Sequence, residues 1–387
     1  MRLSARSPFL AALRRRLGSA AAAPPIGVDF AVERLNLLQV LGDGAPGAPP
    51  TVRAAASIAY PMPREQLLAA PRALRQFVQS ALASAPFAGQ RAFCALAPAD
   101  VRIMPMTVVL APGQSEAQAV ARATREQLGA GIGDAVVDYY QVRNIDGDGS
   151  ERQVLVAVAQ QAQVIAQLDM LRDAGLDPIA LDIGPAAIGR LLGAMGRDDL
   201  SQSVLLINFG LHKSFLTVIW GRRLMLDREI DFGEVQLADK LAASLALPVH
   251  IARGLMREHG IGAGSASRTA TRTVTRSATE PDIGSTIREI LHPEFRLLAE
   301  ELLRTQVYVA SRTRGSTLSR VYLNGSLARY PHIQERLSEL VALPVEVLNP
   351  FDAFTPAASP ATSQAWSEIS KSIALAAGLA LRKEQHG

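Results

Sequence analysis

The hydrophobic pattern contains two segments that resemble each other, at residues 26–40 and 205–219. Each has an apolar run, a short polar turn and a second apolar run. Such a pattern predicts a β-hairpin, because short apolar runs separated by a turn are typical of paired strands. A third strand-like run follows each hairpin, at residues 52–60 and 222–230. The repeat predicts a duplicated α/β protein with a cleft between its halves.

Helical periodicity follows each group of strands. Apolar residues recur at helical spacing around Pro71 in the first half and around Pro248 in the second. Because proline lacks a backbone N–H, each is expected to separate two helices. A long helix is expected at residues 286–311, with a bend at Pro293, and a final helix at residues 373–381.

A further α/β segment separates the two halves. Strands are expected at residues 93–96, 101–109, 136–142 and 154–159. Ser115 and Gln118 have the spacing of a capping box and predict the start of a helix that runs to residue 128. We therefore expect an inserted small α/β domain at residues 92–170. The surrounding core then comprises residues 24–91 and 171–387, with residues 24–91 and 171–200 in its first half and the second half from residue 201.

The positive charge of the chain is gathered in two segments. The 387 residues carry a formal net charge of +4, and residues 1–23 contain five arginines and no acidic residue. Residues 264–279 contain three more arginines in a Ser/Thr-rich, low-complexity stretch, which we expect to be a disordered insertion. The rest of the chain is mildly acidic. A pI near 9.4 therefore does not indicate a nucleic-acid-binding face, and no nucleic-acid partner is expected.

Residues 1–23 are expected to form a basic, flexible tail. Its apolar residues Phe9, Leu10, Leu13 and Leu17 fall at helical spacing, and three consecutive arginines lie between the last two. A short amphipathic helix on an anionic membrane surface would have this pattern, and so would a solvated tail. No apolar run approaches the roughly 20 residues of a membrane-spanning helix.

The chain offers few groups for metal or nucleophilic chemistry. Cys94 is the single cysteine, which excludes an intrachain disulfide and indicates the reducing cytoplasm. It lies in an apolar run and is expected to be a core residue. The six histidines lack the spacing of a zinc site. No metal site and no catalytic residue are predicted.

The order of several motifs is more specific than any one of them. They include Gly27-Val-Asp29, Leu206-Ile-Asn208-Phe-Gly210 and Tyr322-Leu-Asn-Gly325-Ser326. On these motifs the chain resembles the type IV pilus assembly protein PilM family, which is related to the cell-division protein FtsA. The resemblance covers most of residues 26–383. It implies a duplicated actin-like (ribonuclease H-like) α/β fold with an inserted small α/β domain.

The resemblance also implies a nucleotide site formed by three turns, with ATP and Mg²⁺ as the cofactor. Its residues would be Asp29 in the first turn, Asn208, Gly210, Lys213 and Ser214 in the second, and Gly325 and Ser326 in the adenosine-side turn. In such sites, backbone N–H groups cradle the phosphates.

These turns depart from the family pattern. Phe30, Ala31, Val32 and Glu33 follow Asp29, where the family has a Gly-Ser/Thr turn. A glutamate near phosphate is repulsive, and an amide at residue 208 lacks the charge that orients Mg²⁺-bound water. The third turn has one glycine where a pair is usual. These departures favour turns that no longer hydrolyse ATP, while nucleotide binding without turnover and an active ATPase remain alternatives.

The leading hypothesis is an actin-like cytoplasmic scaffold of a type IV pilus or related secretion platform, peripheral at the inner membrane. The resemblance implies that it binds the cytoplasmic N-terminal segment of a bitopic, PilN-like partner beside the small domain. One alternative is an ATPase or phosphotransferase of the actin and sugar-kinase superfamily. Another is a type II secretion or mannose-sensitive (MSHA) pilus component with the same fold.

Overall fold

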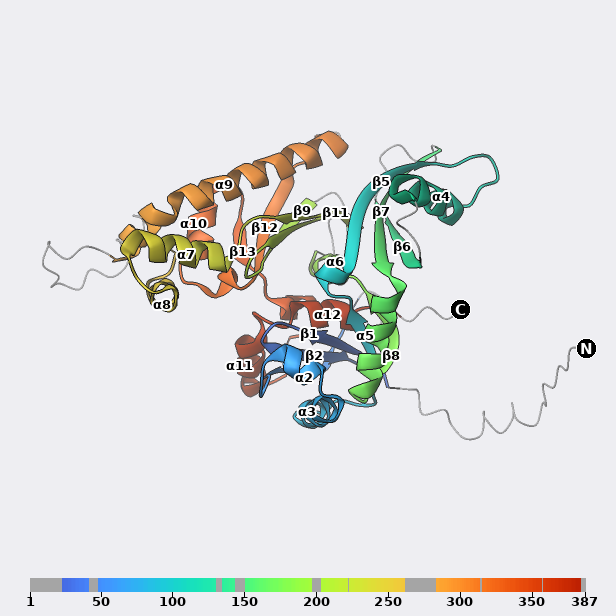
Figure 1. Ribbon diagram of the computed structural model, residues 1–387, viewed down its shortest axis with the longest axis horizontal. Coiled ribbons are helices and arrows are strands. Elements are labelled where there is room, and N and C mark those ends of the chain that lie inside the picture. Colours follow the sequence, from blue (N-terminus) through green and yellow to red (C-terminus); the bar gives the residue numbers. More distant parts are fainter. Residues whose placement is uncertain are drawn as a thin grey trace, which may run out of the picture.

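The computed structural model describes residues 23–41, 48–129, 134–142, 150–196, 203–221, 223–261, 283–313, 315–356 and 358–383. The tail up to residue 22 and the insertion expected at residues 264–279 lie outside this part of the chain. The described residues form two lobes and a small domain beside them (Figure 1). Each lobe is built on a five-stranded sheet, which confirms the predicted duplicated α/β architecture.

The first lobe is built on a mixed sheet with the strand order β3-β2-β1-β4-β8. Its strands are β1 (Ile26–Phe30), β2 (Arg34–Val40), β3 (Val52–Ala59), β4 (Arg91–Ala95) and β8 (Asp177–Asp182). The first three are antiparallel, and β4 and β8 run parallel to β1. Its helices are α2 (Arg64–Leu68), α3 (Pro71–Ala83) and α5 (Gln161–Asp173). Leu74 and Leu171 of these helices pack in the core with Ile26.

The second lobe repeats this order as β11-β10-β9-β12-β13. Its strands are β9 (Ser203–Phe209), β10 (Ser214–Trp220), β11 (Arg223–Ile230), β12 (Leu318–Gly325) and β13 (Val345–Val347). Its helices are α7 (Glu234–Leu245), α8 (Val249–His259), α9 (Ile283–Arg312) and α10 (Ile333–Leu340), and the 3-10 turns η4 (Leu327–Arg329) and η5 (Pro350–Ala353) follow its last strands. Both predicted hairpins and both helix breaks, at Pro71 and Pro248, are confirmed. The helix α9 continues past Pro293.

The small domain is a three-stranded antiparallel sheet with α4 (Glu116–Leu128) on one face. Its strands, in the order β5-β7-β6, are β5 (Val101–Val109), β7 (Glu151–Gln160) and β6 (Ala135–Gln141), and η1 (Pro98–Asp100) precedes β5. The predicted capping box of Ser115 and Gln118 is confirmed. Among the described residues, no helix has the length and apolar character needed to cross a bilayer.

One strand lies in a different sheet from the one expected. The sequence-based boundary at residue 92 assigned β4 to the small domain, but β4 pairs in parallel with β1 and β8 in the first lobe. Its central residues, Ala92, Phe93 and Cys94, are buried, so the expectation of a core Cys94 is confirmed. A short apolar run indicates a buried strand without specifying the sheet that it joins.

Two helices each pack on the lobe opposite to the one that their position in the chain suggests, and they cross between the lobes. The helix α6 (Gly184–Met195) follows the last strand of the first lobe but packs on β10 and β11 of the second. Conversely, α12 (Ala374–Ala380), near the end of the chain, packs on β1, β2 and β4. The two helices lie side by side between the sheets (Figure 1). The expected final helix is confirmed as α12, whereas α6 and α11 (Pro360–Ile369) were not among the predicted elements.

The crossing depends on a glycine. A Cβ atom at Gly378 of α12 would lie 2.1 Å from the carbonyl oxygen of Ala187 in α6. Such a contact is far inside van der Waals distance, and its partner is backbone. The two helices can therefore approach this closely only because position 378 has no side chain.

We expect Gly378→Ala to lower the free energy of unfolding by about 1–3 kcal/mol, because the added methyl group overpacks the crossing. The control is Gly254→Ala in α8, where a Cβ would meet no atom within 4 Å. This control should raise the stability by about 0.5–1 kcal/mol through helix propensity. Thermal unfolding midpoints of both variants check the prediction, and equal shifts would contradict it.

Candidate functional site

The first turn begins at Asp29, a half-buried residue near the end of β1. The side chain of Asn36 donates from Nδ2 to Asp29 Oδ2 at 2.9 Å, and Ser57 Oγ donates to Asn36 Oδ1 at 2.7 Å. Ser57 Oγ also lies 3.0 Å from the hydroxyl of Ser372, just before α12. Burial raises the pKa of Asp29 to about 6, although the hydrogen bond from Asn36 and the charge of Arg64 act to lower it.

Side chains of the same lobe donate hydrogen bonds to the backbone carbonyl groups of the first turn. Arg64 Nε donates to the carbonyl of Phe30 at 3.1 Å, and the hydroxyl of Tyr60 donates to the carbonyl of Ala31 at 2.9 Å. Glu33, next in the turn, places its carboxylate 3.9 Å from the guanidinium of Arg329 in the second lobe. An acidic group of the first turn thus faces a cation across the space between the lobes.

The second and third turns lie against each other at the ends of β9 and β12. Asn324 Nδ2 donates to Asn208 Oδ1 at 3.1 Å, and Ser326 Oγ donates to the carbonyl of Gly210 at 3.1 Å. Gly325 has a φ of +87°, and a Cβ there would lie 2.1 Å from the carbonyl oxygen of Phe209. The structure therefore brings Asn208, Gly210, Gly325 and Ser326 together at the ends of β9 and β12.

The other two residues predicted in the second turn have different surroundings. The buried Ser214 accepts a hydrogen bond from the backbone N–H of Gly210 at 3.4 Å and closes the hairpin. Lys213 forms a hydrogen-bonded ion pair with Glu229 of β11, and Asp231 lies 3.7 Å from its Nζ. The ammonium group is thus already paired with carboxylates of its own lobe.

A buried carboxylate at the start of α7 was not found by sequence reasoning. Glu234 is 6% exposed, accepts a hydrogen bond from the hydroxyl of Tyr330 at 2.8 Å and lies 3.4 Å from Arg253 Nε. Its backbone N–H donates to the carbonyl of Gly210 at 3.2 Å. A helix N-terminus attracts anions, and at the N-terminus of α7 the anionic group is the carboxylate of Glu234. The available signal was an acidic residue directly after the glycine of Phe232-Gly233.

The charges around the first turn do not fit an ATP–Mg²⁺ complex. Glu33 would repel phosphate, and burial raises the pKa of Asp29, because its surroundings disfavour the charged carboxylate. Lys213 is already paired with Glu229. Within the described ranges, no group of three His, Cys, Asp or Glu side chains could hold a metal ion. We therefore derive no chemical step through a nucleotide.

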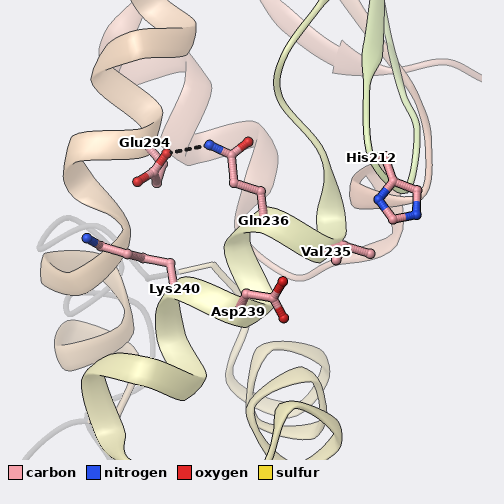
Figure 2. Close-up of a pocket in the computed structure, with 6 residues that line it drawn as sticks. All are labelled: His212, Val235, Gln236, Asp239, Lys240 and Glu294. Atoms are coloured by element: carbon pink, nitrogen blue, oxygen red, sulfur yellow. Dashed lines mark hydrogen bonds between the residues drawn. The ribbon is translucent and has the colours of Figure 1, made fainter.

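An open pocket of about 440 Å³ lies beside the second turn. Figure 2 shows that α7 provides much of its lining, with Glu294 of α9 on one side. The six lining residues are His212, Val235, Gln236, Asp239, Lys240 and Glu294. Gln236 Nε2 donates to Glu294 Oε2 at 2.8 Å. Val235 is the one aliphatic residue in this lining, whereas small-molecule sites are mostly apolar.

The family model of type IV pilus assembly protein PilM matches residues 53–263 and 280–384, which is most of the chain. The chain belongs to the PilM family. Its fold is accordingly the actin-like fold that the sequence motifs implied. No curated protein sequence matched the chain.

Solved structures were also compared with this PilM-family chain. The "PilM-PilN type IV pilus biogenesis complex" has a TM-score of 0.69 and 24% identity, covering 93% of this chain and 98% of that one. The ethanolamine utilization protein EutJ from Carboxydothermus hydrogenoformans has a TM-score of 0.47 and 16% identity, covering 96% of each chain. MreB 5 of Spiroplasma citri, bound to AMPPNP, has a TM-score of 0.42 and 12% identity, covering 86% of this chain and 94% of that one.

The raised pKa of Asp29 gives a pH-dependent prediction. Because its folded pKa of about 6 lies above its ordinary value of 3.8, the folded chain binds the extra proton between these values. Asp29 therefore destabilises the fold increasingly as the pH rises from about 4 to about 6, and fully above that range. Asp29→Asn should then be more stable than the wild type by about 1–3 kcal/mol at about pH 7.5, and equal to it at about pH 4.

Thermal unfolding at both pH values measures this difference. The control is Asp239→Asn, which changes an exposed carboxylate of α7. A shift for Asp29→Asn that is the same at both pH values would contradict the prediction.

Proposed function

We propose that this PilM-family chain is a cytoplasmic scaffold of a type IV pilus assembly platform, peripheral at the inner membrane. In this proposal it holds the cytoplasmic N-terminal segment of a bitopic, PilN-like membrane protein. The observation that carries the proposal is a set of exposed apolar side chains on α5 and on the two strands that it contacts, one in the small domain and one in the first lobe. The name of the similar PilM-PilN complex supports this choice of partner.

These side chains are Val136 of β6, Ile165 of α5 and Ile179 of β8, and all three are exposed. We call them the β6–α5–β8 surface. The helix α5 contacts both strands and runs between the small domain and the first lobe (Figure 1). Clusters of exposed apolar side chains mark sites of protein interaction.

The backbone on both sides of α5 suits an extended peptide. The strand β6 is at one edge of the small sheet, and β8 is at one edge of the first-lobe sheet. An edge strand presents unpaired N–H and C=O groups, to which a peptide can add as a further strand. The apolar side chains of the peptide would then contact Ile165 and its neighbours on this surface.

We expect Ile165→Glu to weaken binding of the partner's N-terminal segment at least about tenfold, because burying an unpaired carboxylate is unfavourable. The matched control is Ile251→Glu on α8. The two isoleucines are 47% and 44% exposed, and both lie on helices. Fluorescence anisotropy with a labelled peptide of the PilN-like protein measures both affinities. Equal affinities of the two variants would argue against this surface.

The second candidate function is that of an ATPase or phosphotransferase. The observation in its favour is the close packing of the second and third turns, where Ser326 contacts Gly210 and Gly325 contacts Phe209. The acidic groups of the first turn argue against it. In the type II secretion and MSHA alternatives the chain has the same scaffold role with a different partner. The same binding assay, with peptides of the membrane proteins of those systems, distinguishes these alternatives from the type IV pilus.

We expect the purified chain to show no Mg-ATP hydrolysis above the rate of a mock preparation, because Glu33 and Asp29 disfavour a phosphate at the first turn. Release of inorganic phosphate from ATP measures the activity. Turnover that is lost in Asp29→Ala and kept in Asp239→Asn would establish the enzymatic alternative.

A further inference from the structure

A single buried carboxylate joins three parts of the molecule. Asp182, the last residue of β8, is 3% exposed. Its Oδ1 accepts hydrogen bonds from the hydroxyl of Tyr140 and from the backbone N–H of Ile183, both at 2.8 Å. Its Oδ2 pairs with the guanidinium groups of Arg190 and Arg382. We call these five residues the Asp182 junction.

The side chains of the junction come from different elements. Tyr140 belongs to β6 of the small domain, Arg190 to α6, and Arg382 follows α12. Arg190 Nε also donates to the carbonyl of Gly378 at 3.2 Å, and Gly378 is the glycine at the helix crossing. The junction thus connects the small domain directly to the point where α6 and α12 meet.

The carboxylate remains ionised in this position. Burial alone would raise the pKa of Asp182, but Arg190, the hydrogen bond from Tyr140, Arg382 and the N–H of Ile183 together hold it below its ordinary value. A buried ion pair is sensitive to the loss of any partner, because the remaining groups then lack compensation. A displacement of Tyr140 would therefore change the ion pairs of Asp182 with both arginines.

The junction also lies on the strand that carries part of the β6–α5–β8 surface. Tyr140 and Val136 are four residues apart on β6, so they lie on the same face of the strand. Tyr139, between them and on the opposite face, packs in the apolar cluster beneath α4. A peptide that binds at Val136 therefore contacts the same face of β6 as Tyr140, whose hydroxyl donates to Asp182.

We propose that Asp182 is the positioning residue through which a partner on the β6–α5–β8 surface changes the crossing of α6 and α12, and with it the relation of the two lobes. The partner step of this inference rests on the proposed function. The connection between β6 and the crossing rests on the junction alone and can be tested without a partner.

The first experiment is amide hydrogen exchange on the free, full-length chain. Tyr140→Phe removes only the hydroxyl, and its ring keeps its place against the apolar cluster of Ala157, Ile183 and Ala186. We expect exchange in α6 and α12 to become about tenfold faster, as the loss of one hydrogen bond to a charged group implies. Tyr139→Phe is the matched control and should leave both helices unchanged. Faster exchange confined to β6, or an equal effect of the control, would overturn the proposal.

The second experiment adds a synthetic peptide of the N-terminal segment of the PilN-like protein. In the wild type, the peptide should slow exchange in α12, and in Tyr140→Phe it should bind without this effect. Equal slowing in both chains would overturn the proposal. If the wild type binds no peptide, the proposed function fails, and the exchange of the free chains alone decides whether the junction links β6 to the crossing.

Discussion

The contact between α6 and α12 holds the two lobes together. Each helix belongs by chain order to one lobe and by packing to the other, so neither sheet has a complete core without the opposite half of the chain. Gly378 makes the close approach to Ala187 possible, and Gly27 of β1 does the same for α12, where a Cβ would lie 2.1 Å from the carbonyl oxygen of Ala376. Backbone packed against backbone leaves little room for adjustment at this crossing.

The turns of the candidate nucleotide site take their positions from this arrangement. A chain of side-chain hydrogen bonds leads from Asp29 through Asn36 and Ser57 to Ser372, which lies just before α12. The chain has kept this geometry while placing carboxylates at the first turn and at the start of α7. Burial raises the pKa of Asp29, the carboxylate at the first turn. The pair of Glu33 and Arg329 connects the first turn to the second lobe.

The proposed partner surface and the Asp182 junction share one strand. The strand β6 contributes Val136 to the β6–α5–β8 surface and Tyr140 to the Asp182 junction. The small domain also extends the second-lobe core, because Val142 and Leu155 pack in the same cluster as Leu224 and Leu226. The small domain therefore contacts both lobes, through a polar junction on one side and an apolar interface on the other.

The sequence by itself determined the repeated hairpins, the helix breaks at Pro71 and Pro248, and the capping box at Ser115. Each of these is set by local periodicity or by the chemistry of a single residue. The residues of the second and third turns were taken from the family resemblance, and their role in binding a nucleotide stays a prediction. Neighbouring residues in the sequence carry the information for the hairpins, the helix breaks and the capping box.

Only the tertiary structure decided which elements meet. An apolar run such as residues 93–96 fits any buried strand, so the sheet that it joins depends on long-range pairing. Arg190 and Arg382 meet at Asp182, although Arg382 lies far from both in the chain, and their sequence neighbours do not record that contact. No helix was predicted at residues 184–195, and the structure shows that the small residues of α6 allow α12 to pack closely against it. Local patterns specify elements, whereas burial and charge pairing between distant segments specify the sites.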